Sequence, residues 1–331
     1  MTIQASAPTR IDLAGGTVDI WPLYLFHPGA QTLNVAISLT ANCKLIPRND
    51  NIVSIESKDT NTFVETTLDK LAQTSELELL VKIIDFFQPK TGLTLITECS
   101  APAGSGLGGS STLDIAVCGA LNHFTKRNYS QSEILTIAKN LETQVIRVPA
   151  GDQDYYPAMY GGTNVMHLTV EGIKREPLAI DLQTLENHLV LCYTGKPHFS
   201  GTNNWEITKN HIDGDKTIFA LFDRIRDITA KMRLALIAGD ITEVASLVNQ
   251  EWQTRKELAP GVSTPKIEEL MVVARQAGGL AAKVCGAGGG GCVTFLVPPD
   301  KKLAISQAIS QAGGQILDYH LVAKGLEVKD V

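Results

Sequence analysis

The sequence lacks the features that mark several large protein classes. It has no hydrophobic run close to the roughly 20 residues that a membrane-spanning helix needs. Its net charge of -6 gives no general basic surface for nucleic acids or anionic membranes. The first ten residues lack a basic region followed by an apolar core, so we expect no secretory signal. These absences favour a cytoplasmic protein that binds neither nucleic acid nor membrane.

Cysteine pairing is also missing. The six cysteines are scattered without a CxxC pair, and most of them lie inside apolar runs. This pattern is typical of reduced core residues, and it argues against a disulfide framework and against a zinc site. What the chain does have is 331 residues, of which 44% are hydrophobic and 19% charged, which is enough for two packed domains.

Strand and helix patterns are mixed along the chain. Alternation and β-forming residues predict strands at 33–48, 52–69, 92–98, 163–178, 188–193 and 315–323. Residues 279–297 look like a strand, a glycine turn and a second strand. Helical spacing predicts helices at 78–88, 132–146, 216–237, 241–258, 265–277 and 300–312, and one that begins at Ser110 or Ser111 as its N-cap.

The ends of one helix are marked clearly, with Thr264 as N-cap, Pro265 at the first position and Gly278 just beyond the end. Because the elements show no strict βαβα alternation, we predict an α+β fold. The change of character near residue 183 predicts two domains, residues 1–183 and 184–331.

The most unusual stretch is PAGSGLGGSST, residues 102–112. It has no lysine and so is not a Walker A motif, and its glycines do not keep dinucleotide-binding spacing. Glycines expose several backbone N–H groups in one concavity, and the helix that follows directs its positive end to the same place. We therefore predict a phosphate site, with a tight strand-to-helix turn capped by serines as the alternative.

Two further stretches accompany this loop, APTRIDLAGGTVD at residues 7–19 and KVCGAGGGGC at residues 283–292. In this order, the three segments resemble the motifs of the GHMP small-molecule kinases. The resemblance spans nearly the whole chain. It implies an N-terminal ribosomal-S5-like domain that binds ATP and a ferredoxin-like C-terminal α/β domain. It also implies transfer of the γ-phosphoryl group of ATP to a hydroxyl of a small metabolite, with Mg²⁺ as cofactor. Several members are dimers, so a homodimer stays open.

The resemblance also implies which residues bind the nucleotide. Glu142 precedes Asp154 by twelve residues, which is the interval between the family's metal-binding glutamate and its catalytic aspartate. Gly109 stands where most members have a first serine, so the implied Mg²⁺ ligands are Ser110 and Glu142. The residues implied to wrap the ATP phosphates are Pro102, Gly104, Ser105, Gly106, Leu107, Gly108, Gly109, Ser110 and Ser111.

By the same resemblance, Asp154 sits beside the acceptor hydroxyl. A carboxylate there can orient the hydroxyl and accept its proton as the bond to phosphorus forms. Asp152 competes for this role, but the spacing of the motif's aspartate from its glycine, here Gly151, favours Asp154. Tyr155 replaces the usual glutamine of this segment. Arg10 is implied to stabilise the ionised aspartate and the charge on the transferring phosphoryl group.

The substrate is indicated less sharply. The first motif and the segment YTGK at 193–196 resemble the heptose kinases, which phosphorylate the anomeric hydroxyl of a heptose 7-phosphate. Candidate partners of that substrate phosphate are Lys196, His198, Arg255 and Lys256. The full set of predicted substrate contacts is Asp19, Gly16, Thr17, Gly151, Gly288, Gly289, Lys196 and Arg255.

Two alternatives remain open. Asp12 and the pair Thr17–Val18 depart from the heptose-kinase pattern, so a free sugar of the galactose, fucose, arabinose or glucuronate type is a second candidate. A non-catalytic sugar- or ATP-binding regulator is a third. That reading predicts loss of Asp154, Glu142 or Ser110, and all three residues are present.

Overall fold

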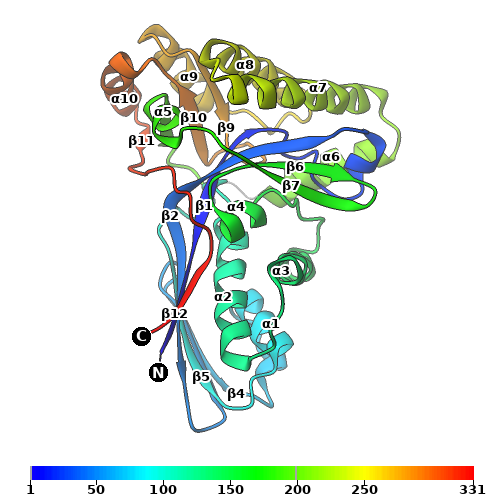
Figure 1. Ribbon diagram of the computed structural model, residues 1–331, viewed down its shortest axis with the longest axis vertical. Helices are drawn as coiled ribbons and strands as arrows, with labels where there is room; N and C mark the ends of the chain where they lie inside the picture. Colours follow the sequence, from blue (N-terminus) through cyan, green and yellow to red (C-terminus); the bar gives the residue numbers. More distant parts are fainter. Residues whose placement is uncertain (1, 198–199) are drawn as a thin grey trace.

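The computed structural model describes residues 2–197 and 200–331, except for the side chains of residues 200–203. Two sheets organise the fold, with helices packed against them (Figure 1). Because strands and helices are mixed in both halves of the chain, the predicted α+β class is confirmed. None of the helices in the described part of the chain combines the length and apolarity needed to cross a bilayer.

The larger sheet is built on one long strand, β2, whose two halves pair with different neighbours. Residues 41–47 of β2 pair with β5, and residues 31–35 pair with β6. The sheet order is β12-β1-β2-β5-β3-β4, and β7 extends the sheet beyond β6. Its strands are β1 (Ile3–Ala14), β2 (Gln31–Pro47), β3 (Ile52–Ser57), β4 (Thr62–Thr67), β5 (Leu93–Cys99), β6 (Thr163–Thr169), β7 (Gly172–Leu178) and β12 (Glu327–Asp330).

Helices cover one face of the lower part of this sheet (Figure 1). A continuous core of aliphatic and aromatic side chains fills the space between them and the strands. These helices are α1 (Glu78–Phe87), α2 (Gly109–Thr125), α3 (Gln131–Ile146) and α4 (Tyr155–Tyr160). The loop of residues 100–108 and the start of α2 lie where β5 leaves the sheet, so the glycine-rich stretch stands at the end of a packed helix.

The second sheet has the order β11-β8-β10-β9 and is antiparallel. Its strands are β8 (Leu189–Tyr193), β9 (Ala281–Val284), β10 (Cys292–Leu296) and β11 (Gln315–Ile316). The helices of this half are α5 (Leu182–Asn187), α6 (Ser200–Ile212), α7 (Lys216–Ala238), α8 (Ile241–Lys256), α9 (Pro265–Gln276) and α10 (Lys302–Gln311). Short 3₁₀ turns complete the fold, η1 (Leu23–Phe26), η2 (Leu71–Gln73) and η3 (Pro299–Lys301).

One apolar cluster joins the two sheets. It combines side chains of β1 and β2, such as Ile11 and Val35, with Leu191 of β8 and with the apolar face of α7 and α8, including Met232 and Leu247. The ends of β1 and β2 are therefore held against the second sheet. This brings the segment that follows β1 close to the glycine turn between β9 and β10.

Several sequence predictions are confirmed, including the capping of α9 by Thr264, whose hydroxyl accepts the Ile267 N–H. Two are wrong. The N-cap of α2 is Gly108 in the left-handed region rather than Ser110 or Ser111. The expected strand at 315–323 shrinks to the two residues of β11.

The chain then returns to the first sheet, where β12 pairs antiparallel with β1. The division into residues 1–183 and 184–331 stays a prediction, and the segment 327–330 belongs by its pairing to the sheet of the first half.

Candidate active site

The glycine-rich loop adopts the conformation that its composition favours. Gly104, Gly106 and Gly108 all have left-handed backbones, with φ of 66°, 72° and 77°. Alternation of left-handed and ordinary residues turns successive N–H groups toward one side, which makes an anion-binding concavity. Among the residues that the structure describes, no side chain caps the start of α2, so the first N–H groups of this helix point into the same loop.

Close backbone packing explains why these positions are glycine. A Cβ on Gly106 would lie 2.5 Å from the Cys285 carbonyl oxygen, and one on Gly291 would lie 2.6 Å from the Ser105 carbonyl oxygen. The Cys292 N–H also donates to the Ser105 carbonyl oxygen at 2.7 Å. The glycine turn of residues 286–291 therefore crosses the phosphate loop at backbone contact distance and supports it from the second half of the chain.

The same turn packs Gly288 and Gly289 against the segment after α8. The Gly289 N–H donates to the Val262 carbonyl oxygen at 2.8 Å, and a Cβ on Gly288 would lie 2.3 Å from that oxygen. The Gly289 amide is thus bonded within the protein, and contact of Gly288 and Gly289 with substrate stays a prediction.

Arg10 and Asp154 meet beside the phosphate loop. Arg10 Nε donates to Asp154 Oδ1 at 2.8 Å, and Arg10 Nη2 lies 2.5 Å from the same oxygen. Arg10 Nη1 donates to the Gly106 carbonyl oxygen at 2.6 Å, and a Cβ on Gly108 would lie 2.9 Å from Asp154 Cγ. Since both recorded contacts use Oδ1, Asp154 Oδ2 is the oxygen that can meet a reacting hydroxyl.

The competing carboxylate is engaged elsewhere. Asp152 Oδ1 forms an ion pair with Lys139 of α3 at 2.8 Å and is buried. Asp154 keeps about a quarter of its side chain exposed and faces the loop. This geometry is the arrangement expected for the predicted roles of Asp154 and Arg10.

Glu142 of α3 lies beside the first turn of α2. Its Oε2 accepts hydrogen bonds from the Ser111 hydroxyl at 2.8 Å and from the Tyr155 hydroxyl. Burial raises the pKa of Glu142, while the hydroxyls of Tyr155, Ser111 and Ser110 oppose that rise. A carboxylate and an exposed serine hydroxyl next to phosphate-binding N–H groups are hard oxygen donors, the set that Mg²⁺ prefers. Ser110 and Glu142 therefore fit the Mg²⁺ that the sequence predicts.

A further acid near this point had no signal in the sequence. Asp114 lies three residues after Ser111 on α2, is fully buried and has no recorded hydrogen bond on either carboxylate oxygen. Burial raises its pKa well above the usual value, and the neighbouring Glu142 carboxylate adds to the rise. Both causes disfavour the charged form of this carboxyl group.

The segment after β1 forms the predicted substrate loop. Asp19 is buried, and its Oδ2 accepts the Gln153 N–H at 2.8 Å. Its Oδ1 has no hydrogen-bond partner in the part of the chain that the structure describes. A Cβ on Gly151 would lie 2.4 Å from Asp19 Oδ2, so glycine is required there. Asp19 and Gly151 are thus adjacent, and one buried carboxylate oxygen is free to accept a hydrogen bond from a substrate hydroxyl.

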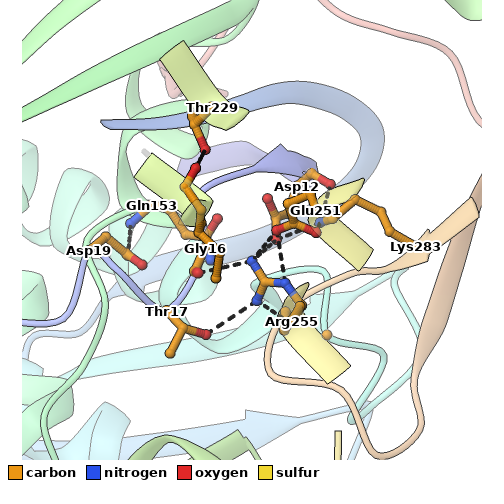
Figure 2. Close-up of polar contacts among 12 residues, drawn as sticks. Asp12, Gly16, Thr17, Asp19, Gln153, Thr229, Glu251, Arg255 and Lys283 are labelled. Atoms are coloured by element: carbon orange, nitrogen blue, oxygen red, sulfur yellow. Dashed lines mark hydrogen bonds and ion pairs between the residues drawn. The ribbon is translucent and has the colours of Figure 1, made fainter. Parts of the chain in front are cut away.

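Four charged side chains are buried together behind this loop, and Figure 2 shows how they face one another. Lys283 Nζ lies 2.9 Å from Asp12 Oδ2 and also donates to the Asp12 carbonyl oxygen at 2.9 Å. Arg255 Nη2 lies 2.6 Å from Glu251 Oε1 and 3.7 Å from Asp12 Oδ2. The two acids and two bases balance in charge, as burial of ions requires.

Arg255 uses this position to hold the substrate loop. Its guanidinium donates to the Gly16 carbonyl oxygen at 2.9 Å and to the Thr17 hydroxyl at 3.2 Å (Figure 2). Thr17 has a φ of 72°, an unusual backbone for a β-branched residue that neighbouring contacts must maintain. Arg255 also donates from Nε to Glu251 Oε1 and from Nη1 to the Gly286 carbonyl oxygen.

This does not fit the prediction that Arg255 binds a substrate phosphate, because its N–H groups are already bonded within the protein. Of the other predicted phosphate partners, Lys256 pairs with Glu268 at 3.4 Å, and its ammonium lies over the Trp252 ring. His198 lies outside the described residues. Lys196 has an exposed side chain, and its carbonyl oxygen accepts the Gly291 N–H at 2.9 Å, which places it beside the glycine turn.

Comparison with known proteins identifies the family. The models for "GHMP kinases N terminal domain" and "GHMP kinases C terminal" match residues 78–162 and 232–315. A D-glycero-alpha-D-manno-heptose 7-phosphate kinase of Campylobacter jejuni is 30% identical over 336 residues, which cover 98% of each chain. The chain belongs to the GHMP kinases. As a GHMP kinase it is an ATP-dependent phosphotransferase that acts on a small molecule, and the predicted family is confirmed.

Solved structures agree with this GHMP fold. A D-glycero-D-manno-heptose 1-phosphate kinase from Bacteroides thetaiotaomicron has a TM-score of 0.80 at 24% identity, and the match covers 99% of both chains. Lactococcus lactis galactokinase in complex with galactose has a TM-score of 0.83 at 20% identity, covering 98% of this chain and 95% of that one. At these identities the likeness shows the fold alone.

The buried charge cluster predicts a large stability effect. Lys283→Met leaves Asp12 with Arg255 as its nearest cation, at 3.7 Å, and we expect the free energy of unfolding to fall by about 3–5 kcal/mol. Urea denaturation measures the change. Lys324→Met, which removes an exposed pair with Glu327, is the matched control and should leave the unfolding midpoint unchanged. Equal stability of the Lys283 variant and the wild type would contradict the assignment.

Asp19 predicts a pH dependence of stability. Burial raises its pKa from 3.8 to about 7, against the opposing Gln153 N–H. Between these values the folded protein holds a proton that the unfolded chain has released, so the unfolding free energy falls as pH rises toward 7. Asp19→Asn removes this contribution, and its profile should be flatter by about 1.4 kcal/mol per pH unit in that interval. Urea denaturation at a series of pH values tests this, and parallel profiles would refute it.

Proposed function

We propose that this GHMP kinase phosphorylates a sugar hydroxyl, and that the anomeric hydroxyl of a heptose 7-phosphate is the first candidate acceptor. The observation that carries the proposal is the cluster of Arg10, Asp154 and the glycine loop, which puts an oriented carboxylate beside a phosphate site. The full-length relative from Campylobacter jejuni supports the choice of a heptose phosphate.

The residues divide the work as follows. The N–H groups of the glycine loop and of the first turn of α2 bind the ATP phosphates. The acceptor hydroxyl donates to Asp154 Oδ2 and gives up its proton there, while its oxygen bonds to the γ-phosphorus and the bond to the departing ADP oxygen breaks. Arg10 pairs with Asp154 and orients its carboxylate. Ser110 and Glu142 would hold the Mg²⁺ of Mg-ATP, which would supply neutralisation of the phosphate charge.

The loop after β1 binds the substrate that accepts the phosphoryl group. Asp19 Oδ1 is a buried acceptor without a recorded partner, which suits a hydroxyl-rich substrate and disfavours an anionic group at that point. Arg255 fixes the loop of Gly16 and Thr17 around the substrate through its own hydrogen bonds. We therefore assign Arg255 a positioning role and leave Lys196 as the cation available for a substrate phosphate.

A free sugar is the second candidate, and one observation favours it. Arg255 and Lys256, two of the predicted phosphate partners, are committed to Glu251 and Glu268. Among the predicted partners that the structure describes, Lys196 is then the one available to bind the phosphate group of a phosphorylated substrate. An unphosphorylated sugar needs no such partner.

Asp154→Asn tests the catalytic assignment. The amide keeps the size of the side chain but cannot take the hydroxyl proton, so turnover should fall by about 100-fold or more. Nucleotide affinity should stay near the wild-type value, measured by titration with a non-hydrolysable ATP analogue. Asp318→Asn, an exposed substitution of the same kind, is the control. Wild-type turnover by Asp154→Asn would remove Asp154 from the mechanism.

The acceptor is identified by a coupled ADP-release assay with Mg-ATP. The panel contains heptose 7-phosphate, mannose, galactose, fucose, arabinose, glucuronate, homoserine and mevalonate. We expect turnover with heptose 7-phosphate, and we expect Lys196→Gln to raise its KM by about tenfold, the cost of losing a charge-assisted contact. Turnover on an unphosphorylated sugar that Lys196→Gln leaves unchanged would support the second candidate. Turnover confined to homoserine or mevalonate would refute both.

A further inference from the structure

Glu142 is held by two hydroxyl groups from different helices. The Ser111 hydroxyl, at the start of α2, donates to Oε2 at 2.8 Å. The Tyr155 hydroxyl, at the start of α4, donates to the same oxygen. Both phenol and carboxylate are buried, with Tyr155 exposed by 1% and Glu142 by 6%. Such hydrogen bonds to a buried carboxylate are strong and directional.

The use of a single oxygen has a geometric consequence. Rotation about the last bond of a glutamate is loosely restricted in the absence of contacts. Two donors on Oε2 remove that freedom and leave Oε1 as the oxygen that faces away from them. Ser110, which is exposed at the start of α2, also lies close enough to Glu142 to stabilise its charge. Glu142 Oε1 and the hydroxyl oxygen of Ser110 are thus the two oxygens available to one cation.

Both the ring and the backbone of Tyr155 are held in place. Its ring packs in the core of the first half, among side chains such as Ala116 and Ala158. Its backbone follows directly after Asp154, whose carboxylate is anchored by Arg10. Two consecutive residues thus serve the two functional carboxylates. Asp154 carries one of them, and the phenol of Tyr155 bonds to the other, that of Glu142.

We infer that Tyr155 is a positioning residue that orients the Glu142 carboxylate, through Oε2, for binding the Mg²⁺ of Mg-ATP. The inference rests on the proposed metal role of Glu142. Tyr155 does not touch the cation or the reacting atoms. It acts as an outer partner of a metal ligand, and partners of this kind commonly set metal affinity.

The test compares Tyr155→Phe with the wild type. Binding of Mn²⁺, a spectroscopic substitute for Mg²⁺, is measured by electron paramagnetic resonance in the presence of a non-hydrolysable ATP analogue. We expect about tenfold weaker Mn²⁺ binding and a matching rise in the Mg²⁺ concentration that gives half-maximal activity. KM for the acceptor should be unchanged. Tyr160→Phe, on the same helix, keeps its ring under Arg175 and serves as the matched control.

The outcomes separate this inference from the proposed function. If Glu142→Gln weakens Mn²⁺ binding but Tyr155→Phe binds Mn²⁺ like the wild type, the role of Tyr155 is wrong and the metal site stands. If Glu142→Gln itself leaves Mn²⁺ binding unchanged, the metal assignment and the inference both fail. Ser111→Ala removes the other bond to Oε2 and should weaken Mn²⁺ in the same direction, which keeps the orientation argument testable if Tyr155→Phe does not fold.

Discussion

The buried contact between β1 and the second half of the chain supports everything else in the site. Asp12 lies near the end of β1, and its buried side chain meets those of Lys283 of β9 and Arg255 of α8. Removing two acids and two bases from solvent is costly unless the pairing is close and the polar atoms are satisfied. The cluster therefore tolerates little relative movement of the elements that carry it. Gly16 shows how tight the fit is, because a Cβ there would lie 2.7 Å from Asp12 Oδ2 and from Gln153 Nε2.

The buried charge cluster positions both the substrate side and the nucleotide side of the site. Toward the acceptor, Arg255 fixes the carbonyl of Gly16 and the hydroxyl of Thr17, and so shapes the loop that carries Asp19. Toward the nucleotide, the turn after Lys283 passes under the phosphate loop at backbone distance. Arg10 then connects the phosphate loop to Asp154. In the proposed reaction, the geometry between acceptor and γ-phosphate thus depends on residues that contact neither of them.

The sequence predicted the parts of this arrangement that have a local signal. Alternation located β5 and β6, helical spacing located α1, α3 and α7, and the density of glycine located the phosphate loop. β1 was not predicted as a strand, although its residues alternate in polarity from Ile3 to Leu13. Long-range features had no such signal. β12 is a strand because of its pairing with β1, more than 300 residues away in the chain. A serine N-cap was expected for α2, but the loop needs a left-handed residue before the helix, and Gly108 fills that position.

The site shows the same division. Asp154, Arg10 and Glu142 were predicted through motif spacing, and the structure brings them to the phosphate loop. Asp12, Glu251 and Lys283 were not predicted as a group because their meeting depends on the packing of β1, α8 and β9. Arg255 was assigned as a phosphate partner from its charge and from its segment's resemblance to the heptose kinases. Neither signal distinguishes a buried ion pair from a ligand contact. Asp114 and the phenol of Tyr155 were missed for a similar reason, since their importance comes from what they lie beside.

The return of the chain to its first sheet also bears on how the protein is made. β1 pairs with β12 through Ile3 and Asp330, and the backbones of Thr2 and Val331 bond to each other (Figure 1). Synthesis runs from the N-terminus, so β1 keeps one unpaired edge while all of the second half is being made. An uncovered edge strand is a template for wrong pairing. β1 is therefore synthesised long before β12, the strand that covers this edge, and in that interval the edge is open to wrong pairing.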